Sequence, residues 1–333
     1  MRKAIQHILL VVAVLLCAVP GLEAQTDGQL SQYYQVPSFY NPAALGRTDY
    51  IRIRGGARLQ WLGVDKAPRT FVAVADMPVK ISGKRIGVGV VLDQESAGLY
   101  STFSAGLQAG YKLKKWGGVW TVGLQVGMYD QSFKGSEVDI PDDDDYHDSN
   151  DEGIPTSDVH GTAIDFGAGL WYDHKLFYAG LSCTHLTSPT VKMKLDGQDT
   201  GGAGTTAERY FEFQTRRTLY FTAGGNIQVK NTLFEILPSV IVKSDFTFTT
   251  GQVDARVRYN KFLTFGVGYR WNDAVIATVA AEYKNFFIGY SYDYSTSAIA
   301  KASSGSHELF AGYSLKLNLG DKNRHRHKSI RVM

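Results

Sequence analysis

Apolar and polar residues alternate along most of the chain from residue 50 onward. The clearest run is VDARVRYN at 253–260, and similar runs are LTFGVGYRW at 263–271 and FFIGYSYDYS at 286–295. Successive side chains of a β-strand point to opposite faces of the sheet. Each run therefore predicts a strand with one apolar, aromatic face and one face of glycine, hydroxyl and charged residues.

The alternation recurs in fourteen segments, several of them near the roughly 9–11 residues of a transmembrane strand. An even number of strands is typical of single-chain bacterial barrels. The predicted strands are 50–61, 69–77, 84–93, 101–113, 117–131, 162–173, 175–185, 217–229, 233–244, 251–260, 262–271, 275–284, 286–295 and 307–318.

The lengths of the connections support this count. If both ends of the barrel are periplasmic, every second connection is a periplasmic turn and should be short. The connections at the expected periplasmic positions are indeed short, and they are 81–83, 114–116, 173–174, 229–232, 260–261 and 284–285. The long connections fall on the other parity and are expected outside the cell: 132–161, 186–216 and 296–306.

A soluble β-sandwich shows the same alternation, and two features favour lipid instead. The polar face is rich in glycine with scattered charge, as a barrel interior can be, and aromatic residues gather at segment ends: Trp61, Tyr111, Tyr172, Trp271 and Tyr283. The composition, with 35 glycines, 19 tyrosines and 17 phenylalanines, fits the same class. We predict an all-β fold, a transmembrane antiparallel up-and-down β-barrel over residues 50–319, in the outer membrane.

The two ends of the chain are predicted to lie outside the barrel. Residues 1–24 have the basic start, the short apolar run and the small residue Ala24 of a cleaved secretory signal peptide. Cleavage there removes Cys17 and leaves Cys183 alone, so we expect neither an internal disulfide nor a cysteine zinc site. Residues 320–333 form a basic tail, expected in the periplasm.

Residues 25–49 precede the barrel and are expected to act as a periplasmic, plug-like segment. Proline and asparagine there argue against a strand. Large aromatic side chains should not stay in water, so we predict that the segment packs at the periplasmic mouth and forms a plug and partner surface. Its key residues are predicted to be Tyr33, Tyr34, Phe39, Tyr40, Asn41 and Pro42.

Opposite charges are predicted to meet inside the barrel. The polar face of the first strand carries arginines, and the last strands carry carboxylates. The arginines follow directly after the 25–49 segment and are expected to donate hydrogen bonds to its carbonyl groups. Barrel closure brings these strands side by side, and the set either lines a pore or forms a packed network. The predicted lumen charges are Arg52, Arg54, Arg58, Glu282, Asp293 and Glu308.

Sequence motifs give no support for catalysis, a cofactor or a metal site. The chain lacks the spacings of a hydrolase elbow, a zinc protease and a phosphate loop. The acidic run at 142–152, the glycines at 201–204 and the histidines of the tail fit solvated or flexible segments better. Ser306 and His307 lack an evident acidic partner, so we predict no enzyme. A net charge of +3 does not indicate nucleic acid.

Several motifs together resemble the PorP/SprF family of outer-membrane proteins of the type IX secretion system. They are QLSQY (29–33), YNPAALG (40–46), RLQW (58–61), IGVGV (86–90), YSYDYS (290–295) and GSHEL (305–309).

The resemblance implies a non-enzymatic component of the type IX secretion and gliding machinery. Its implied partners are the outer-membrane lipid bilayer, periplasmic components of the secretion machinery and an exported cell-surface protein whose export or anchoring it aids. An outer-membrane channel for small solutes is the alternative. Residues 132–215 match no family motif.

Overall fold

The computed structural model describes residues 28–138, 155–195 and 209–317. The predicted signal peptide, the acidic run at 142–152, the glycines at 201–204 and the basic tail lie outside the described residues. Within the described residues, no helix is long and apolar enough to cross a membrane.

The strands are β1 (Tyr50–Leu59), β2 (Arg69–Ile81), β3 (Lys84–Ala97), β4 (Tyr100–Lys115), β5 (Gly118–Lys134), β6 (Asp158–Asp173), β7 (Phe177–Thr184), β8 (Thr190–Lys194), β9 (Tyr210–Gln214), β10 (Thr218–Gly225), β11 (Ile227–Gln228), β12 (Phe234–Ser244), β13 (Thr249–Tyr259), β14 (Leu263–Arg270), β15 (Ala274–Tyr283), β16 (Phe286–Ser295) and β17 (Ser306–Lys316). The short helices are η1 (Tyr33–Gln35), α2 (Pro37–Tyr40), η2 (Gly135–Glu137) and η3 (Ala298–Lys301).

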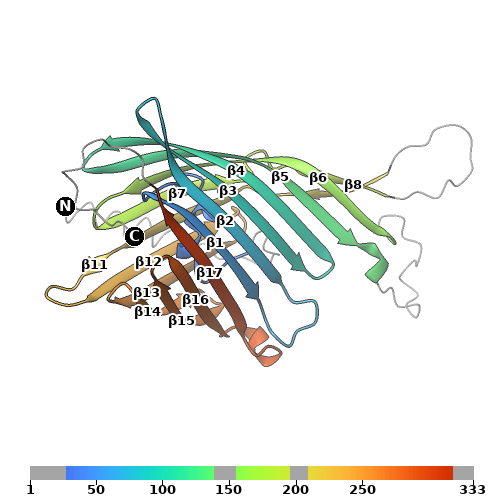
Figure 1. Cartoon of the computed structure of the whole chain (residues 1–333). Coiled ribbons are helices and arrows are strands. Elements are labelled where there is room, and N and C mark those ends of the chain that lie inside the picture. The colour runs from blue at the N-terminus through green and yellow to red at the C-terminus, as the bar shows by residue number, and fades with distance from the viewer. Residues whose placement is uncertain (1–27, 139–154, 196–208, 318–333) are drawn as a thin grey trace, which may run out of the picture.

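The main sheet closes on itself, so the predicted barrel is confirmed. It runs in the order β10-β7-β6-β5-β4-β3-β2-β1-β17-β16-β15-β14-β13-β12-β11, with a further pairing of β10 to β12. Leaving out the two-residue β11 from these 15 strands gives fourteen barrel strands, all antiparallel to their neighbours. The seam pairs β1 with β17 and places Arg58 directly opposite Glu308. Figure 1 shows the strands wrapped around the N-terminal segment.

The two faces of the barrel have the predicted polarity. On β13, Val253 is 53% exposed and points outward, while Asp254 and Arg256 are buried inside. On β14 and β16 the outward positions Phe265 and Ile288 are likewise exposed. The apolar face therefore meets lipid, and the polar residues face the lumen.

The connections separate into a short-turn end and a long-loop end, as predicted. Strands β2 and β3 are joined by two residues, Ser82 and Gly83, both with positive φ, and β15 and β16 by Lys284 and Asn285. Short turns of outer-membrane barrels are periplasmic. We therefore name this end, which also holds the start of β1 and the end of β17, the periplasmic end.

Some predicted strand boundaries were wrong. The strand predicted at 217–229 is broken between β10 and β11, where the ladder is interrupted opposite Leu237 and Pro238. Proline has no N–H to donate to a ladder, which explains the break. The predicted outer loop 186–216 contains the hairpin β8–β9, and β8 packs against the outer part of β6 (Figure 1). Both hairpin strands alternate in burial, but each has only five residues, fewer than a membrane-spanning strand needs.

Candidate functional site in the barrel lumen

The described part of the N-terminal segment, residues 28–49, contains no strand, and it lies inside the barrel up to Gly46. Pro37 begins α2, where its fixed φ suits the first helical position. The helix ends at Tyr40, and the side-chain oxygen of the following Asn41 accepts a hydrogen bond from the backbone N–H of Ala43 at 2.8 Å. Proline and asparagine thus shape a compact segment that packs by side chains. We call residues 28–49 the lumen segment.

Ser31 is the first of three points at which the lumen segment is fixed to the barrel wall. Its backbone N–H donates to the Glu308 carboxylate at 2.7 Å, and its hydroxyl donates to the Asp293 carboxylate at 2.6 Å. The same hydroxyl oxygen accepts from Arg58 at 2.8 Å and from Arg270 at 2.7 Å. A serine hydroxyl has one proton and two lone pairs, so all of its hydrogen-bonding capacity is used.

The wall groups around Ser31 also pair with one another. Arg58 lies 2.8 Å from Asp293 and 3.4 Å from Glu308, and Arg270 lies 3.2 Å from Asp293. All four of these side chains are almost fully buried. Buried charges are tolerated when they are paired and hydrogen-bonded, and Ser31 supplies part of that pairing. We call Ser31 with these four wall residues the Ser31 network.

Of the six predicted lumen charges, the structure brings three together in the Ser31 network: Arg58, Asp293 and Glu308. Arg52 instead pairs with Asp76 on β2 at 3.0 Å. The Arg54 guanidinium stacks over the Phe287 ring at 5.0 Å. Glu282 lies opposite Phe287 in the register of β15 and β16 and is not part of the Ser31 network.

Arg270 and Gln252 belong to this site and were not singled out from the sequence. The alternation places Arg270 on the lumen face of β14, but it does not say which lumen residue it meets. Gln252 accepts from Arg270 at 2.9 Å and donates to the Ser31 carbonyl at 2.8 Å. The expectation that the arginines of the first strand donate to segment carbonyls was wrong for Arg58, which reaches the Ser31 hydroxyl.

Asn41 is the second fixing point. Its side-chain amide donates to the carbonyl groups of Leu170 on β6 and Leu181 on β7, at 3.1 and 3.3 Å. The wall carries glycine where the segment touches it, since a Cβ on Gly169 would lie 2.0 Å from the Asn41 side-chain oxygen. A Cβ on Gly123 would lie 2.2 Å from the Pro42 carbonyl oxygen. Glycines of the wall thus allow the close approach.

The third fixing point lies at the periplasmic end. The backbone N–H of Gly46 donates to Asp76 at 2.8 Å, and Lys112 donates to the Gly46 carbonyl. Gly46 has a φ of +53° and lies against the backbone of β2, so a side chain is doubly disfavoured there. Next to it, Arg47 forms an ion pair with Asp173 at 2.6 Å.

The aromatic residues named from the sequence lie within the lumen. Tyr33 and Tyr40 are buried in a cluster with wall residues, and Tyr34 and Phe39 pack at its edge. Arg256 of β13 stacks on the Tyr34 ring at 3.3 Å.

The segment reaches further than the predicted periplasmic mouth. Gly46 lies near the periplasmic end, whereas Ser31 contacts the opposite ends of β1, β16 and β17. Asn41 and Pro42 are buried between these levels. The predicted position at the periplasmic mouth was therefore incomplete, because the segment extends through the lumen toward the opposite end. The segment bonds to the wall at Ser31, Asn41 and Gly46, and the burial of its aromatic residues alone did not predict these bonds.

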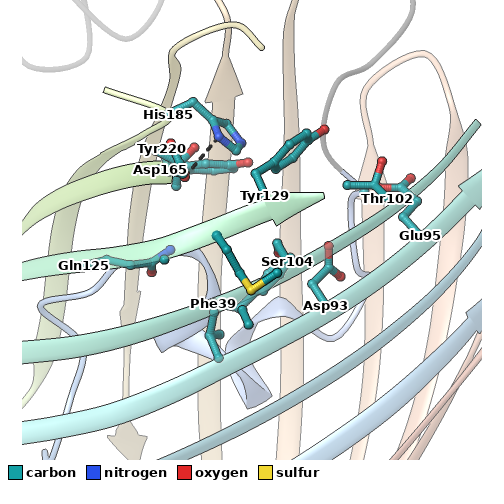
Figure 2. A pocket seen from close by; sticks show the side chains of 16 residues that line it. Phe39, Asp93, Glu95, Thr102, Ser104, Gln125, Tyr129, Asp165, His185 and Tyr220 are labelled. Atoms are coloured by element: carbon teal, nitrogen blue, oxygen red, sulfur yellow. Dashed lines mark ion pairs between the residues drawn. The ribbon is translucent and has the colours of Figure 1, made fainter. Parts of the chain in front are cut away.

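A cavity of about 50 Å³ lies beside the lumen segment, bounded by Gly28, Phe39 and residues of β3 to β7 and β10. Figure 2 shows Asp93, Glu95 and Asp165 around it, with Asp165 paired to His185. Over the described residues, no three His, Cys, Asp or Glu side chains gather in a way that would hold a metal ion.

Ser306 and His307 are neighbours in the sequence but lie on opposite faces of the barrel wall. The His307 ring contacts the Tyr290 hydroxyl at 2.6 Å, on the outward face of the barrel. The Ser306 hydroxyl faces inward and accepts from the backbone N–H of Trp61 at 3.1 Å. The alternation of a strand puts these neighbours on opposite faces.

The chain is similar to one protein family and to a group of solved outer-membrane barrels. The profile of the family described as type IX secretion system membrane protein PorP/SprF matches residues 22–313. No curated protein matches the chain at a significant level.

Three solved barrels illustrate the structural likeness. A Pseudomonas aeruginosa FadL homologue is 10% identical, with a TM-score of 0.47, over 85% of this chain and 94% of that one. The Pseudomonas putida toluene transporter TodX is 8% identical, with a TM-score of 0.46, over 87% and 95%. The translocator domain of the autotransporter NalP from Neisseria meningitidis is 10% identical, with a TM-score of 0.42, over 80% and 87%.

Proposed function

Since the chain belongs to the PorP/SprF family of type IX secretion system membrane proteins, we propose that this outer-membrane barrel aids the export or surface anchoring of a secreted protein. Its proposed partners are periplasmic components of the secretion machinery and an exported cell-surface protein, as in gliding. The barrel then acts by holding proteins, and its lumen need not conduct.

The single observation that carries the proposal is the filled lumen. The lumen segment is fixed at Ser31, Asn41 and Gly46, from one end of the barrel to the other. A cavity beside it among the described residues is about 50 Å³, enough for a few water molecules. A barrel that passes solutes at rest needs a continuous opening, and a small cavity favours a role in protein handling over the alternative of a solute channel.

The first experiment measures conduction by the purified barrel. In liposomes the wild-type protein should give swelling rates for small sugars near those of empty liposomes. A variant lacking residues 29–46 should swell much faster, because the wall of the lumen is polar. Rapid swelling with the wild-type barrel would favour the solute channel and overturn the proposal.

The second experiment tests for a partner. The tagged wild-type protein, solubilised from native outer membrane, should retain a secretion-machinery component or an exported protein in a pull-down. The variant lacking residues 29–46 should lose it if the lumen segment forms part of the partner surface. Gly167→Ala is a suitable control, because a Cβ at this lumen position meets only ordinary contacts at 3.5 Å. Equal recovery with the deletion variant would show that the segment only fills the barrel.

A further inference from the structure

Exposed lysines encircle the periplasmic end of the barrel. Each of the six turns at this end carries one in the turn or at its edge, and they are Lys84, Lys115, Lys175, Lys230, Lys261 and Lys284. At the seventh position, where the chain enters β1 and leaves β17, Lys316 ends β17 and is also exposed. We call these seven residues the lysine rim. Its positive charge is distributed around the whole closed wall.

Carboxylates of the described residues do not neutralise this charge. None of the seven lysines forms an ion pair within the described part of the chain. At the same end, Asp49 is exposed and pairs with Arg85 at 2.9 Å. Asp173, Glu235 and Glu282 occupy lumen-facing positions of their strands. The lysine rim therefore suits a partner that carries negative charge.

Three ammonium groups of the lysine rim lie over exposed aromatic rings. The pairs are Lys84 over Tyr111 at 5.5 Å, Lys115 over Trp116 at 4.9 Å and Lys284 over Tyr283 at 5.3 Å. Tyr283 shares the outward face of β15 with Val279, and both are exposed. Outward aromatic residues near strand ends form the girdle of a barrel at the boundary between lipid and water. These ammonium groups therefore lie at the level of the lipid headgroups.

The distribution of the lysine rim favours lipid over a protein partner. A protein docked at the mouth covers one patch, whereas an exposed lysine is present at all seven positions around the wall. Headgroups surround a barrel on every side, and basic residues near an anionic lipid surface are attracted to it. The apolar stem of lysine can follow the wall while its ammonium group reaches the headgroups.

We propose that the lysine rim binds the phosphate groups of anionic phospholipids in the periplasmic leaflet of the outer membrane. These contacts hold the periplasmic end of the barrel at a fixed depth in the bilayer. The inference goes beyond the proposed function and does not depend on any exported partner.

The test measures which lipid the wild-type barrel holds at its surface. The protein is purified from outer membrane and reconstituted in phosphatidylcholine vesicles with a trace of spin-labelled phosphatidylglycerol or phosphatidylcholine. At about 10 mM salt, where the Debye length is about 30 Å, phosphatidylglycerol should associate with the protein about twofold or more better than phosphatidylcholine. At about 1 M salt the Debye length is about 3 Å, and this selectivity should disappear. Equal association at low salt, or selectivity that salt does not change, would overturn the proposal.

A variant of the lysine rim locates the binding site. It carries Lys115→Gln, Lys175→Gln and Lys284→Gln, all at exposed positions outside the lumen. Its heat-dependent gel mobility should show a folded barrel, and it should lose about half or more of the selectivity for phosphatidylglycerol. Wild-type selectivity in this variant would overturn the proposal. The salt dependence of the wild-type barrel tests the same charge pairing without any substitution.

The control changes the net charge equally at the outer end. It carries Lys66→Gln, Lys134→Gln and Lys192→Gln, and each of these lysines pairs with Glu137 or Glu212. Because carboxylates already offset these outer charges, the control should keep the wild-type selectivity. An equal loss in both variants would show an effect of net charge and would overturn the assignment to the lysine rim.

An acidic periplasmic protein is the competing occupant of the lysine rim. In that case the wild-type barrel would show no lipid selectivity. In a pull-down from native outer membrane, the variant of the lysine rim would then lose a protein that the control retains. That combination would overturn the lipid proposal and assign the lysine rim to a protein.

Discussion

Ser31 and Asp293 lie 262 positions apart in the chain, yet the Ser31 hydroxyl donates to the Asp293 carboxylate across 2.6 Å. This bond joins a segment that precedes the barrel to its second-last strand. It exists because barrel closure places Arg58, Asp293 and Glu308 around one point of the lumen. Closure of the sheet and filling of the lumen are therefore linked at this network.

Ser31→Ala should loosen the lumen segment. The change removes the donor to Asp293 and the acceptor for Arg58 and Arg270 but leaves these charged groups buried. Losing a buried partner costs about 1–3 kcal/mol, and the loss should appear as a lower free energy of unfolding in lipid vesicles and as faster liposome swelling. The control is Ser136→Ala, because the Ser136 hydroxyl also donates to a carboxylate, Asp158, but at an exposed site. Stability and swelling equal to wild type would contradict this role of Ser31.

Gly169→Ala should displace the segment at its second fixing point. The added Cβ would lie 2.0 Å from the Asn41 side-chain oxygen, and strand backbone behind Gly169 cannot yield easily. We expect a folded barrel with increased swelling and a loss of about 1–3 kcal/mol from overpacking. Gly167→Ala, two residues away on the same lumen face, should behave as wild type. If the two variants show the same swelling rate and the same stability, the close approach of Asn41 to Gly169 does not hold the segment in place.

The faces and turns of the barrel were predictable from the sequence because they depend on local rules. A period of two puts Val253 outside and Asp254 inside wherever the strand lies. Two-residue turns such as Lys284-Asn285 fix where strands end. The even strand count and the short-turn parity then follow without knowledge of any contact.

The contacts inside the lumen were less predictable because they depend on register and on the path of the segment. Arg58 and Glu308 face each other across the seam, which strand order alone suggests. Arg270 joins them through its ion pair with Asp293 and through the Ser31 hydroxyl, which the segment brings between two walls. A small polar residue within an aromatic segment was the one available signal for Ser31, and the same signal marks Asn41.

Acid should release a contact at the outer loops. Glu137 of η2 lies 2.8 Å from Lys134 and 3.0 Å from Lys66, and the Lys134 hydrogen bond, followed by that from Lys66, lowers the pKa of Glu137 below its ordinary value of 4.5. A carboxylate whose pKa is lower in the folded state stabilises the fold above its unfolded pKa, and this contribution is lost as pH falls through the folded pKa.

The measurement is the distance distribution between spin labels at Asp65 and Ser136. It should be narrow at pH 6 and broaden as pH falls through the lowered pKa of Glu137, because Glu137 then loses its charge. Glu137→Gln should give the broad distribution at both pH values. A narrow distribution in the variant at pH 6 would show that the two loops are held by something other than this carboxylate.

A charge on the lipid-facing side of β13 should destabilise the barrel according to its depth. Val253 lies near the middle of β13 (Thr249–Tyr259), points outward and is 53% exposed, so Val253→Arg places a guanidinium in hydrocarbon. The expected cost is about 2–4 kcal/mol at the bilayer midplane, falling to about 0–1 kcal/mol near the interface. Val257→Arg, two residues from the periplasmic end of the same strand, should therefore cost less. Reversible unfolding in lipid vesicles measures both. Equal costs, or no cost at Val253, would mean that this face of β13 does not meet the bilayer as the strand pattern requires.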